Sequence, residues 1–112
     1  IGAGAEPGYD PGMRRADVID ALKSTESELR RFGVASLYLF GSHARDTASP
    51  ESDIDVFVDP RNDDDFGFLE FMGAYDALRE KLGPNVGIGY STRDGISQYV
   101  RDAVEREAIK IF

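Results

Sequence analysis

The 112-residue chain contains no cysteine and only one histidine, His43. The absence of cysteine excludes a disulfide framework and thiolate metal sites, and it is compatible with a cytoplasmic protein. A single histidine also argues against a zinc site built from imidazole side chains. A metal ion bound by this chain would therefore have oxygen ligands, which favours magnesium, manganese or calcium.

Long apolar runs are absent, and so is an N-terminal basic region followed by an apolar stretch. We therefore expect neither a membrane span nor a secretory signal. Positive charge is scarce, with 13 basic against 21 acidic residues and a net charge of −8. Such a surface repels a phosphate backbone, so direct nucleic-acid binding is not expected. A small nucleotide neutralised by a divalent cation, or a basic protein partner, is compatible with it.

The length allows one small domain with a single core. Residues 1–12 are rich in glycine and proline and lack periodicity. We interpret them as a flexible leader of the kind added for expression, and residues 13–112 as the domain, with Met13 as a natural start.

Apolar periodicity and glycine or proline breaks predict an alternation of helices and strands. In chain order we expect a helix over 14–32, a strand over 34–40, a helical turn ending near 46, a loop over 47–52, a strand over 53–58, a helix over 66–82, a strand over 85–90 and a helix over 96–109. The fold class is thus α/β or α+β, with a small mixed sheet of about three strands and helices packed against it.

Helical spacing also predicts which side chains face the core. We expect the inward residues of the two later helices to be Phe68, Leu69, Met72, Tyr75, Leu78 and Leu82, followed by Ile96, Val100, Ala103, Val104 and Glu107.

The turn Gly41-Ser42 follows an expected strand and precedes a short helix. Glycine lets a ligand approach the backbone closely, a helix start offers N–H groups to phosphate oxygens, and the Ser42 hydroxyl can donate one more hydrogen bond. Such turns are also common without any ligand. Arg45 can contact phosphate or brace this turn, or it can simply pair with a surface acid. His43 adjoins the turn and could contact phosphate, but we expect it to be exposed, as a lone histidine in a polar turn usually is.

Asp53 and Asp55 lie two residues apart on an expected strand, so both carboxylates share one face. They could converge on one or two metal ions. The alternative is a solvated strand face, but neighbouring like charges repel and aspartate is a poor strand former, and a cation would relieve both problems. A Gly-Ser pair, ten residues and Asp-x-Asp occur together by chance in roughly one chain per thousand of this length.

The string GSHARDTASPESDID, from Gly41 to Asp55, resembles the signature of the nucleotidyltransferase fold related to DNA polymerase beta. It is close to the Gly-Ser-x-Ala-Arg-Gly…Ser-Asp-Ile-Asp pattern of the minimal nucleotidyltransferases. The resemblance covers nearly all of residues 14–112, because the expected order of elements is also that of the family. Asp46 stands where the family usually has glycine.

This resemblance implies transfer of a nucleoside monophosphate, usually AMP from Mg-ATP, to a hydroxyl group. Gly41, Ser42 and Arg45 would bind the nucleotide, and Asp53 and Asp55 would be catalytic and hold Mg²⁺ or Mn²⁺. Many small members are similar to the antitoxin of a toxin–antitoxin pair, whose partner is a helical HEPN-type ribonuclease that some members modify with AMP on a tyrosine.

One departure concerns the third carboxylate that the family usually places on the third strand. Gly87, in the string Val-Gly-Ile-Gly, occupies its position. Three explanations stay open: the domain binds nucleotide but is slow or inactive, another acid such as Asp59 or Asp94 substitutes, or Gly87 is a change from an original aspartate. Asp59 would lie about 13 Å further along the strand than Asp55, which makes it a poor substitute.

Three functions are compatible with these observations. The first is an active nucleotidyltransferase, and the second is a degenerate member that acts as a protein-binding antitoxin module. The third is metal binding by the two aspartates without a nucleotide. A small domain with a shallow site rarely encloses its substrate alone, so we expect a homo-oligomer or a HEPN-type partner chain.

Overall fold

A computed structural model of the protein describes residues 14–112, so the leader expected over residues 1–12 lies outside the described part. The helices are α1 (Arg15–Lys23), α2 (Glu26–Arg31), α3 (Gly41–Arg45), α4 (Phe68–Leu82) and α5 (Arg101–Glu107). The strands are β1 (Val34–Phe40), β2 (Ile54–Pro60), β3 (Ile88–Thr92) and β4 (Ile109–Lys110). Short 3₁₀ turns cover Asp63–Asp65 and Arg93–Gly95. Within residues 14–112, no helix has the length and apolar character that crossing a membrane requires.

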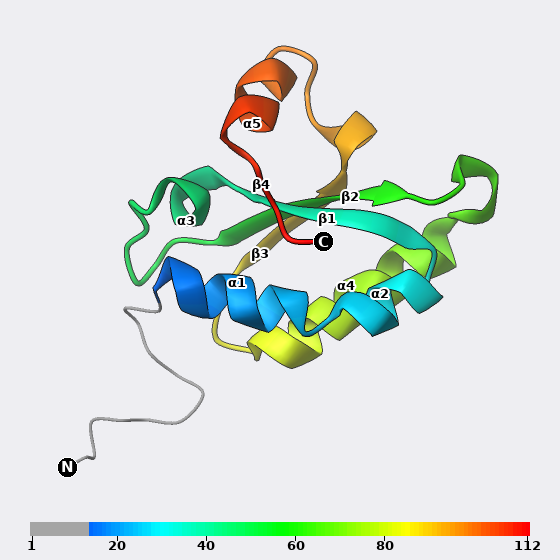
Figure 1. Cartoon of the computed structure of the whole chain (residues 1–112), viewed down its shortest axis with the longest axis horizontal. Coiled ribbons are helices and arrows are strands. Elements are labelled where there is room, and N and C mark those ends of the chain that lie inside the picture. Colours follow the sequence, from blue (N-terminus) through cyan, green and yellow to red (C-terminus); the bar gives the residue numbers. More distant parts are fainter. Residues whose placement is uncertain (1–13) are drawn as a thin grey trace.

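The strands form one mixed sheet in the order β3-β2-β1-β4. β1 runs antiparallel to β2 and β4, and β2 runs parallel to β3. Figure 1 shows α1, α2 and α4 on one face of this sheet and α5 on the other. The predicted fold class is confirmed, and the sheet has four strands where we expected about three.

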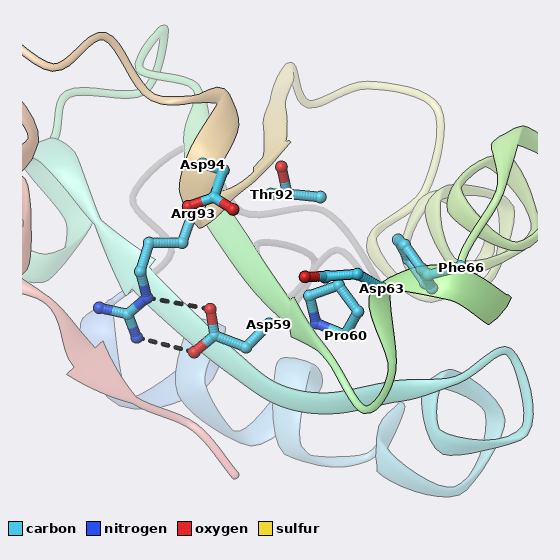
Figure 2. A pocket seen from close by; sticks show the side chains of 7 residues that line it. All are labelled: Asp59, Pro60, Asp63, Phe66, Thr92, Arg93 and Asp94. Carbon is cyan, nitrogen blue, oxygen red and sulfur yellow. Dashed lines mark hydrogen bonds and ion pairs between the residues drawn. The ribbon is translucent and has the colours of Figure 1, made fainter.

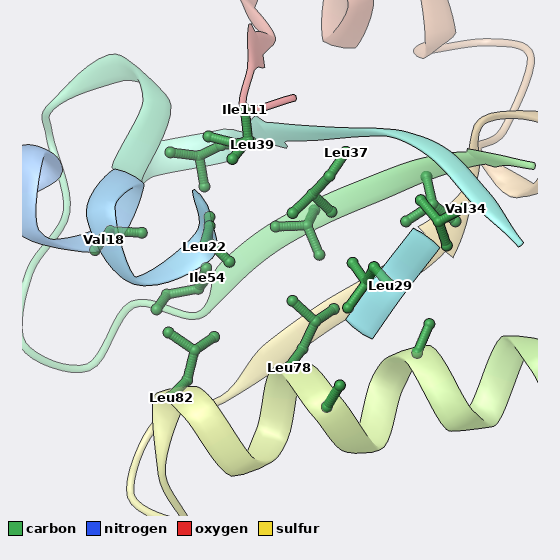
Figure 3. Close-up of a cluster of buried hydrophobic side chains, with 14 of the residues drawn as sticks. Val18, Leu22, Leu29, Val34, Leu37, Leu39, Ile54, Leu78, Leu82 and Ile111 are labelled. Atoms are coloured by element: carbon green, nitrogen blue, oxygen red, sulfur yellow. The ribbon is translucent and has the colours of Figure 1, made fainter. Parts of the chain in front are cut away.

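The larger core lies between the sheet and the helices α1, α2 and α4 (Figure 3). Its fully buried side chains come from every one of these elements: Val18, Leu22, Leu29, Val34, Leu37, Leu39, Ile54, Val56, Val58 and Leu78. Because strand side chains alternate between faces, Ile54, Val56 and Val58 of β2 face this core. The residues between them therefore face α5.

A smaller cluster covers part of the opposite face. Phe57 of β2 is fully buried there with Ile96 and Val104, and Tyr38 stacks on it with ring centroids 4.7 Å apart. α5 thus anchors to the sheet through an aromatic patch in the middle of β1 and β2. The face that carries Asp55 is the face on which α5 lies.

The helix expected over 14–32 is interrupted at Thr25, which is buried. Its hydroxyl donates a hydrogen bond of 2.6 Å to the carbonyl of Leu22, and its N–H donates to the same oxygen. This local bond competes with the regular helical pattern, and α2 begins at the residue after Thr25. The expected strand over 85–90 lies two to three residues later, and the expected helix over 96–109 is reduced to α5 and followed by β4.

The inward face of α4 differs from the prediction in its first turn. Phe68 and Leu69 are 75% and 79% exposed, whereas Leu78 and Leu82 are buried as expected. The other buried residues of α4 are the alanines Ala74 and Ala77, whose small side chains let the helix approach its neighbours. The buried residues of α4 thus begin at Ala74, and its first turn lies outside the core. Ile96 and Val104 are buried as expected, although Ile96 precedes α5, and Val100 is half exposed just before the helix begins.

Substitution of Leu78 by alanine should lower the free energy of unfolding by about 2–5 kcal/mol, because a fully buried side chain leaves a cavity. Leu69→Ala on the same helix is the matched control and should change it by less than about 0.5 kcal/mol. Urea unfolding of both variants measures the difference, and similar losses would contradict the burial of α4 described above.

Candidate functional site

The Gly41-Ser42 turn joins the end of β1 directly to α3. Gly41 has φ +78°, which is the left-handed region, and a Cβ atom built on it would collide with Oδ2 of Asp55. The pairing of β1 with β2 sets Phe40 opposite Asp55, so the turn that follows Phe40 lies beside this carboxylate. The structure therefore brings together two parts of the sequence motif, and only glycine fits at position 41.

Asp53 directly precedes β2, and Asp55 lies within it on the same face. Both carboxylates lie over glycines of the neighbouring chain segment. A Cβ atom on Gly87 would collide with Oδ1 of Asp53, and one on Gly89 would collide with Oδ1 of Asp55. The position expected for a third acid is thus filled by the carboxylate of Asp53.

Two acids so arranged are electrostatically unfavourable without a cation. Burial raises the pKa of the Asp55 carboxyl, and the charge of Asp53 raises it further, while His43 and Arg45 oppose these effects. Among residues 14–112, no group of three or more acidic or histidine side chains is placed to hold a metal ion. Two carboxylates fit Mg²⁺ or Mn²⁺ all the same, because these ions commonly bind one or two carboxylates and complete their shell with phosphate and water.

Arg45 lies at the end of α3, and its side chain is half exposed. Its Nη1 donates to both carboxylate oxygens of Glu107, at 2.9 and 3.2 Å. The same carboxylate accepts the backbone N–H of Gly41 at 2.8 Å. Sequence reasoning gave Glu107 only a place on a helix face. No local pattern could have linked it to a glycine 66 positions earlier.

His43 is buried, with 6% of its surface exposed, which contradicts the expectation of an exposed side chain. It is the third residue of α3, a helix that packs against α1, β1 and β2 and so turns this position inward. Asp46 ends α3 with φ 63°, a left-handed conformation. Glycine adopts it at lower cost than other residues, which explains why the resembling family usually has glycine there.

The two acids considered as substitutes for the missing carboxylate lie elsewhere. Asp59, near the end of β2, is bound by Arg93 through two hydrogen bonds of 2.9 and 2.7 Å. Figure 2 shows this pair in a pocket that Asp94 also lines. Arg93 further lies over the Phe57 ring at 4.9 Å. Neither acid reaches the Gly41 turn. Two of the three explanations therefore remain: the domain binds nucleotide but is slow or inactive, or Gly87 is a change from an original aspartate.

Comparison with known proteins agrees with this geometry. The profile of the nucleotidyltransferase domain family matches residues 21–111. The chain belongs to this family. The chain is also 32% identical over 98 residues to the protein named "Putative protein adenylyltransferase MJ1379" of Methanocaldococcus jannaschii, with 86% of this chain and 96% of that protein covered.

Two solved structures share the fold. One described as a "putative minimal nucleotidyltransferase" superposes with a TM-score of 0.72 at 28% identity, covering 87% of this chain and 95% of the other. A second, a nucleotidyltransferase-like protein from Sulfolobus solfataricus, has a TM-score of 0.51 at 17% identity, with coverage of 86% and 80%, and supports the fold alone. These matches assign the chain the general chemistry of its family, which is nucleotidyl transfer.

The close approach of the Asp55 carboxylate to Gly41 predicts that alanine at position 41 destabilises the protein more than alanine at another glycine with positive φ. Gly41→Ala and Gly83→Ala both place alanine at a positive φ, a strained backbone that costs about 1–3 kcal/mol at each site. Only the first also forces a side chain into Asp55, since nothing lies within 4 Å of a Cβ on Gly83. Gly41→Ala should therefore lose about 1–3 kcal/mol more than Gly83→Ala in urea unfolding. Equal losses would show that Asp55 does not press against the turn.

The charge of Asp55 predicts a pH-dependent effect in metal-free protein. A carboxyl whose pKa is raised by folding destabilises the native state once pH exceeds the unfolded value, because ionisation then costs more in the folded chain. Asp55→Asn should accordingly raise Tm near neutral pH, and the gain should shrink toward about pH 4. Added Mg²⁺ should raise the Tm of the wild type and have little effect on the variant. A lower Tm for the variant at neutral pH would contradict this account.

Proposed function

We propose that this domain binds a nucleoside triphosphate with a divalent cation and transfers the nucleoside monophosphate to a hydroxyl acceptor. We propose AMP from Mg-ATP as the group transferred, because one relative is named a protein adenylyltransferase. The observation that carries the proposal is the contact of the Asp55 carboxylate with the Gly41-Ser42 turn, with Asp53 on the same face. This arrangement leaves a cation and a phosphate chain adjacent binding positions.

Each residue of the site would have a separate role in binding or transfer. Asp53 and Asp55 would hold Mg²⁺ or Mn²⁺, which when bound neutralises charge on the phosphates and on the reacting oxygens. The Ser42 hydroxyl and the guanidinium of Arg45 would hold the β- and γ-phosphates, and Gly41, which has no side chain, would let the phosphates approach the turn closely. The acceptor oxygen then forms its bond to the α-phosphorus as the bond to pyrophosphate breaks, and the acceptor proton passes to water. Positioning supplies most of the rate enhancement in such reactions.

A protein hydroxyl is the acceptor that best fits the comparisons, because the Methanocaldococcus jannaschii relative is named a protein adenylyltransferase. A partner chain would then be substrate as well as binding partner. We propose a HEPN-type helical protein for this role, with this domain as the antitoxin of a cytoplasmic pair. A homo-oligomer is the alternative assembly that would complete the shallow site.

A degenerate, protein-binding antitoxin is the second candidate function, and Gly87 is the observation that favours it. A general base must reach the proton that it removes, and the side chain that the family uses is missing here. Asp59 is held by Arg93 and Asp94 lies in the same distant pocket, so neither replaces it. We therefore expect nucleotide binding with slow transfer.

The test is a titration of the protein with ATP, with and without Mg²⁺, together with transfer of labelled AMP to candidate acceptors. We expect Mg²⁺-dependent binding, and Asp53→Asn or Asp55→Asn should reduce transfer by about a hundredfold or more. Failure of the wild type to bind ATP in the presence of Mg²⁺ would overturn the proposal. Complexes with a protein partner that survive both substitutions while transfer is undetectable would support the degenerate antitoxin instead.

Gly87→Asp is a gain-of-function test of the same site. A Cβ at position 87 would collide with the Asp53 carboxylate alone, so Asp53 must change its rotamer, and we expect the variant to fold and still to bind Mg²⁺ through Asp53 and Asp55. Restoration of a general base should raise the transfer rate by about a hundredfold, within the range for such groups. An unchanged rate in a folded variant that still binds Mg-ATP would show that Gly87 is not what limits transfer.

A further inference from the structure

Glu107 is the last residue of α5, the helix that lies alone on the second face of the sheet (Figure 1). Its side chain is 24% exposed, whereas that of its ion-pair partner Arg45 is 52% exposed. Val104 of the same helix is buried beside Phe57, so α5 is fixed to the sheet one turn before Glu107. The carboxylate therefore projects from a well-anchored position toward the neighbouring turn.

This carboxylate holds both ends of α3. It accepts the N–H of Gly41, the first residue of α3, and Nη1 of Arg45, the last. Ser42 lies between these two attachment points. One side chain from a distant part of the sequence thus fixes the short segment that carries Ser42 and Arg45, the two proposed phosphate donors.

Each of the two bonds opposes a different source of disorder. Gly41 has unusual conformational freedom, and a charged acceptor at 2.8 Å fixes the direction of its N–H. Arg45 is long and exposed, and an ion pair with a half-buried carboxylate restricts its rotamers. Arginine carries five N–H donors and Glu107 uses those of Nη1, so other donors can still meet a phosphate oxygen.

We infer that Glu107 is a positioning residue that orients the Gly41-Ser42 turn and Arg45 for the triphosphate. The inference rests on the proposed function. The side chain of Glu107 is long enough to accept hydrogen bonds from two donors at once, and this positions the turn. Its negative charge by itself opposes phosphate binding. Length and charge at position 107 should therefore affect nucleotide affinity in opposite directions.

Two conservative variants separate these effects, one shorter with the charge kept and one of equal length without the charge. Glu107→Asp keeps the charge but is one methylene too short to span both donors, and it should weaken Mg-ATP binding by about tenfold. Glu107→Gln keeps the length and an acceptor oxygen, and its affinity should stay within about threefold of the wild type. The matched control is Glu105→Asp, on the same helix with similar exposure and an ion pair to Arg93, which Asp59 continues to hold.

Calorimetric titration with Mg-ATP gives the affinities, and amide NMR of nucleotide-free protein gives a second readout. The Gly41 amide proton should lose its hydrogen-bonded chemical shift in Glu107→Asp and retain most of it in Glu107→Gln. Glu105→Asp should leave both the shift and the affinity unchanged, within about twofold for the affinity. Circular dichroism confirms that each variant is folded.

Several results would overturn the inference. If Glu107→Gln binds Mg-ATP more tightly than the wild type while Glu107→Asp is unchanged, the carboxylate is an electrostatic competitor and not a positioning group. If Glu105→Asp weakens binding as much as Glu107→Asp, the effect is a general loss of stability. If the chemical shift of the Gly41 amide proton does not change in Glu107→Asp, Glu107 does not orient the turn. Failure of the wild type to bind Mg-ATP is distinct from these, since it removes the proposed function and the inference with it.

Discussion

The site depends on the contact between the Asp55 carboxylate and Gly41, and this contact depends on the register of β1 with β2. Antiparallel pairing places Phe40 opposite Asp55, so the turn after Phe40 begins beside the carboxylate. A slip of one residue would direct Asp55 into the core and Val56 outward, at a large cost in buried apolar area. The hydrophobic alternation of β2 therefore fixes the position of the acid as well as the core.

The two faces of the sheet are covered to different extents, and this leaves the two acids of the site accessible. Three helices bury one face, whereas the other is covered by α5 over the middle of β1 and β2. The start of β2 is left accessible on the second face, and there Asp53 and Asp55 lie beside the turn. Glu107 enters the same region from the end of α5, which links the packing of that helix to the geometry of the site.

The acids of β2 have different environments at its two ends. Asp59 is neutralised by Arg93, which is itself stacked over Phe57 and bound to Glu105. At the other end, the pKa of Asp55 is raised by burial and by the charge of Asp53, and the nearby Arg45 is paired with Glu107. The first arrangement is a satisfied structural ion pair. The second retains uncompensated negative charge, which suits a group that meets a cation only when ligand binds.

Local sequence patterns were sufficient for β1, the Gly41 turn, α3 and β2, because strand alternation and turn chemistry are properties of short segments. They failed where burial depends on how a helix meets its neighbours. Phe68 and Leu69 have helical spacing but lie in a turn of α4 beyond the core, and His43 is buried because α3 packs inward. The two-residue β4 was also missed, since a strand so short has no periodicity to detect.

The sequence by itself determined the fold class, the Gly-Ser and Asp-x-Asp elements of the site, and the absence of an acid at Gly87. Each of these follows from residue type and spacing along a few consecutive positions. Only the tertiary structure decided that Asp53 lies over Gly87, that Asp59 is held by Arg93, and that Glu107 holds the turn. These contacts join residues distant in the chain, and their partners are fixed by sheet register and helix packing, which no local pattern encodes.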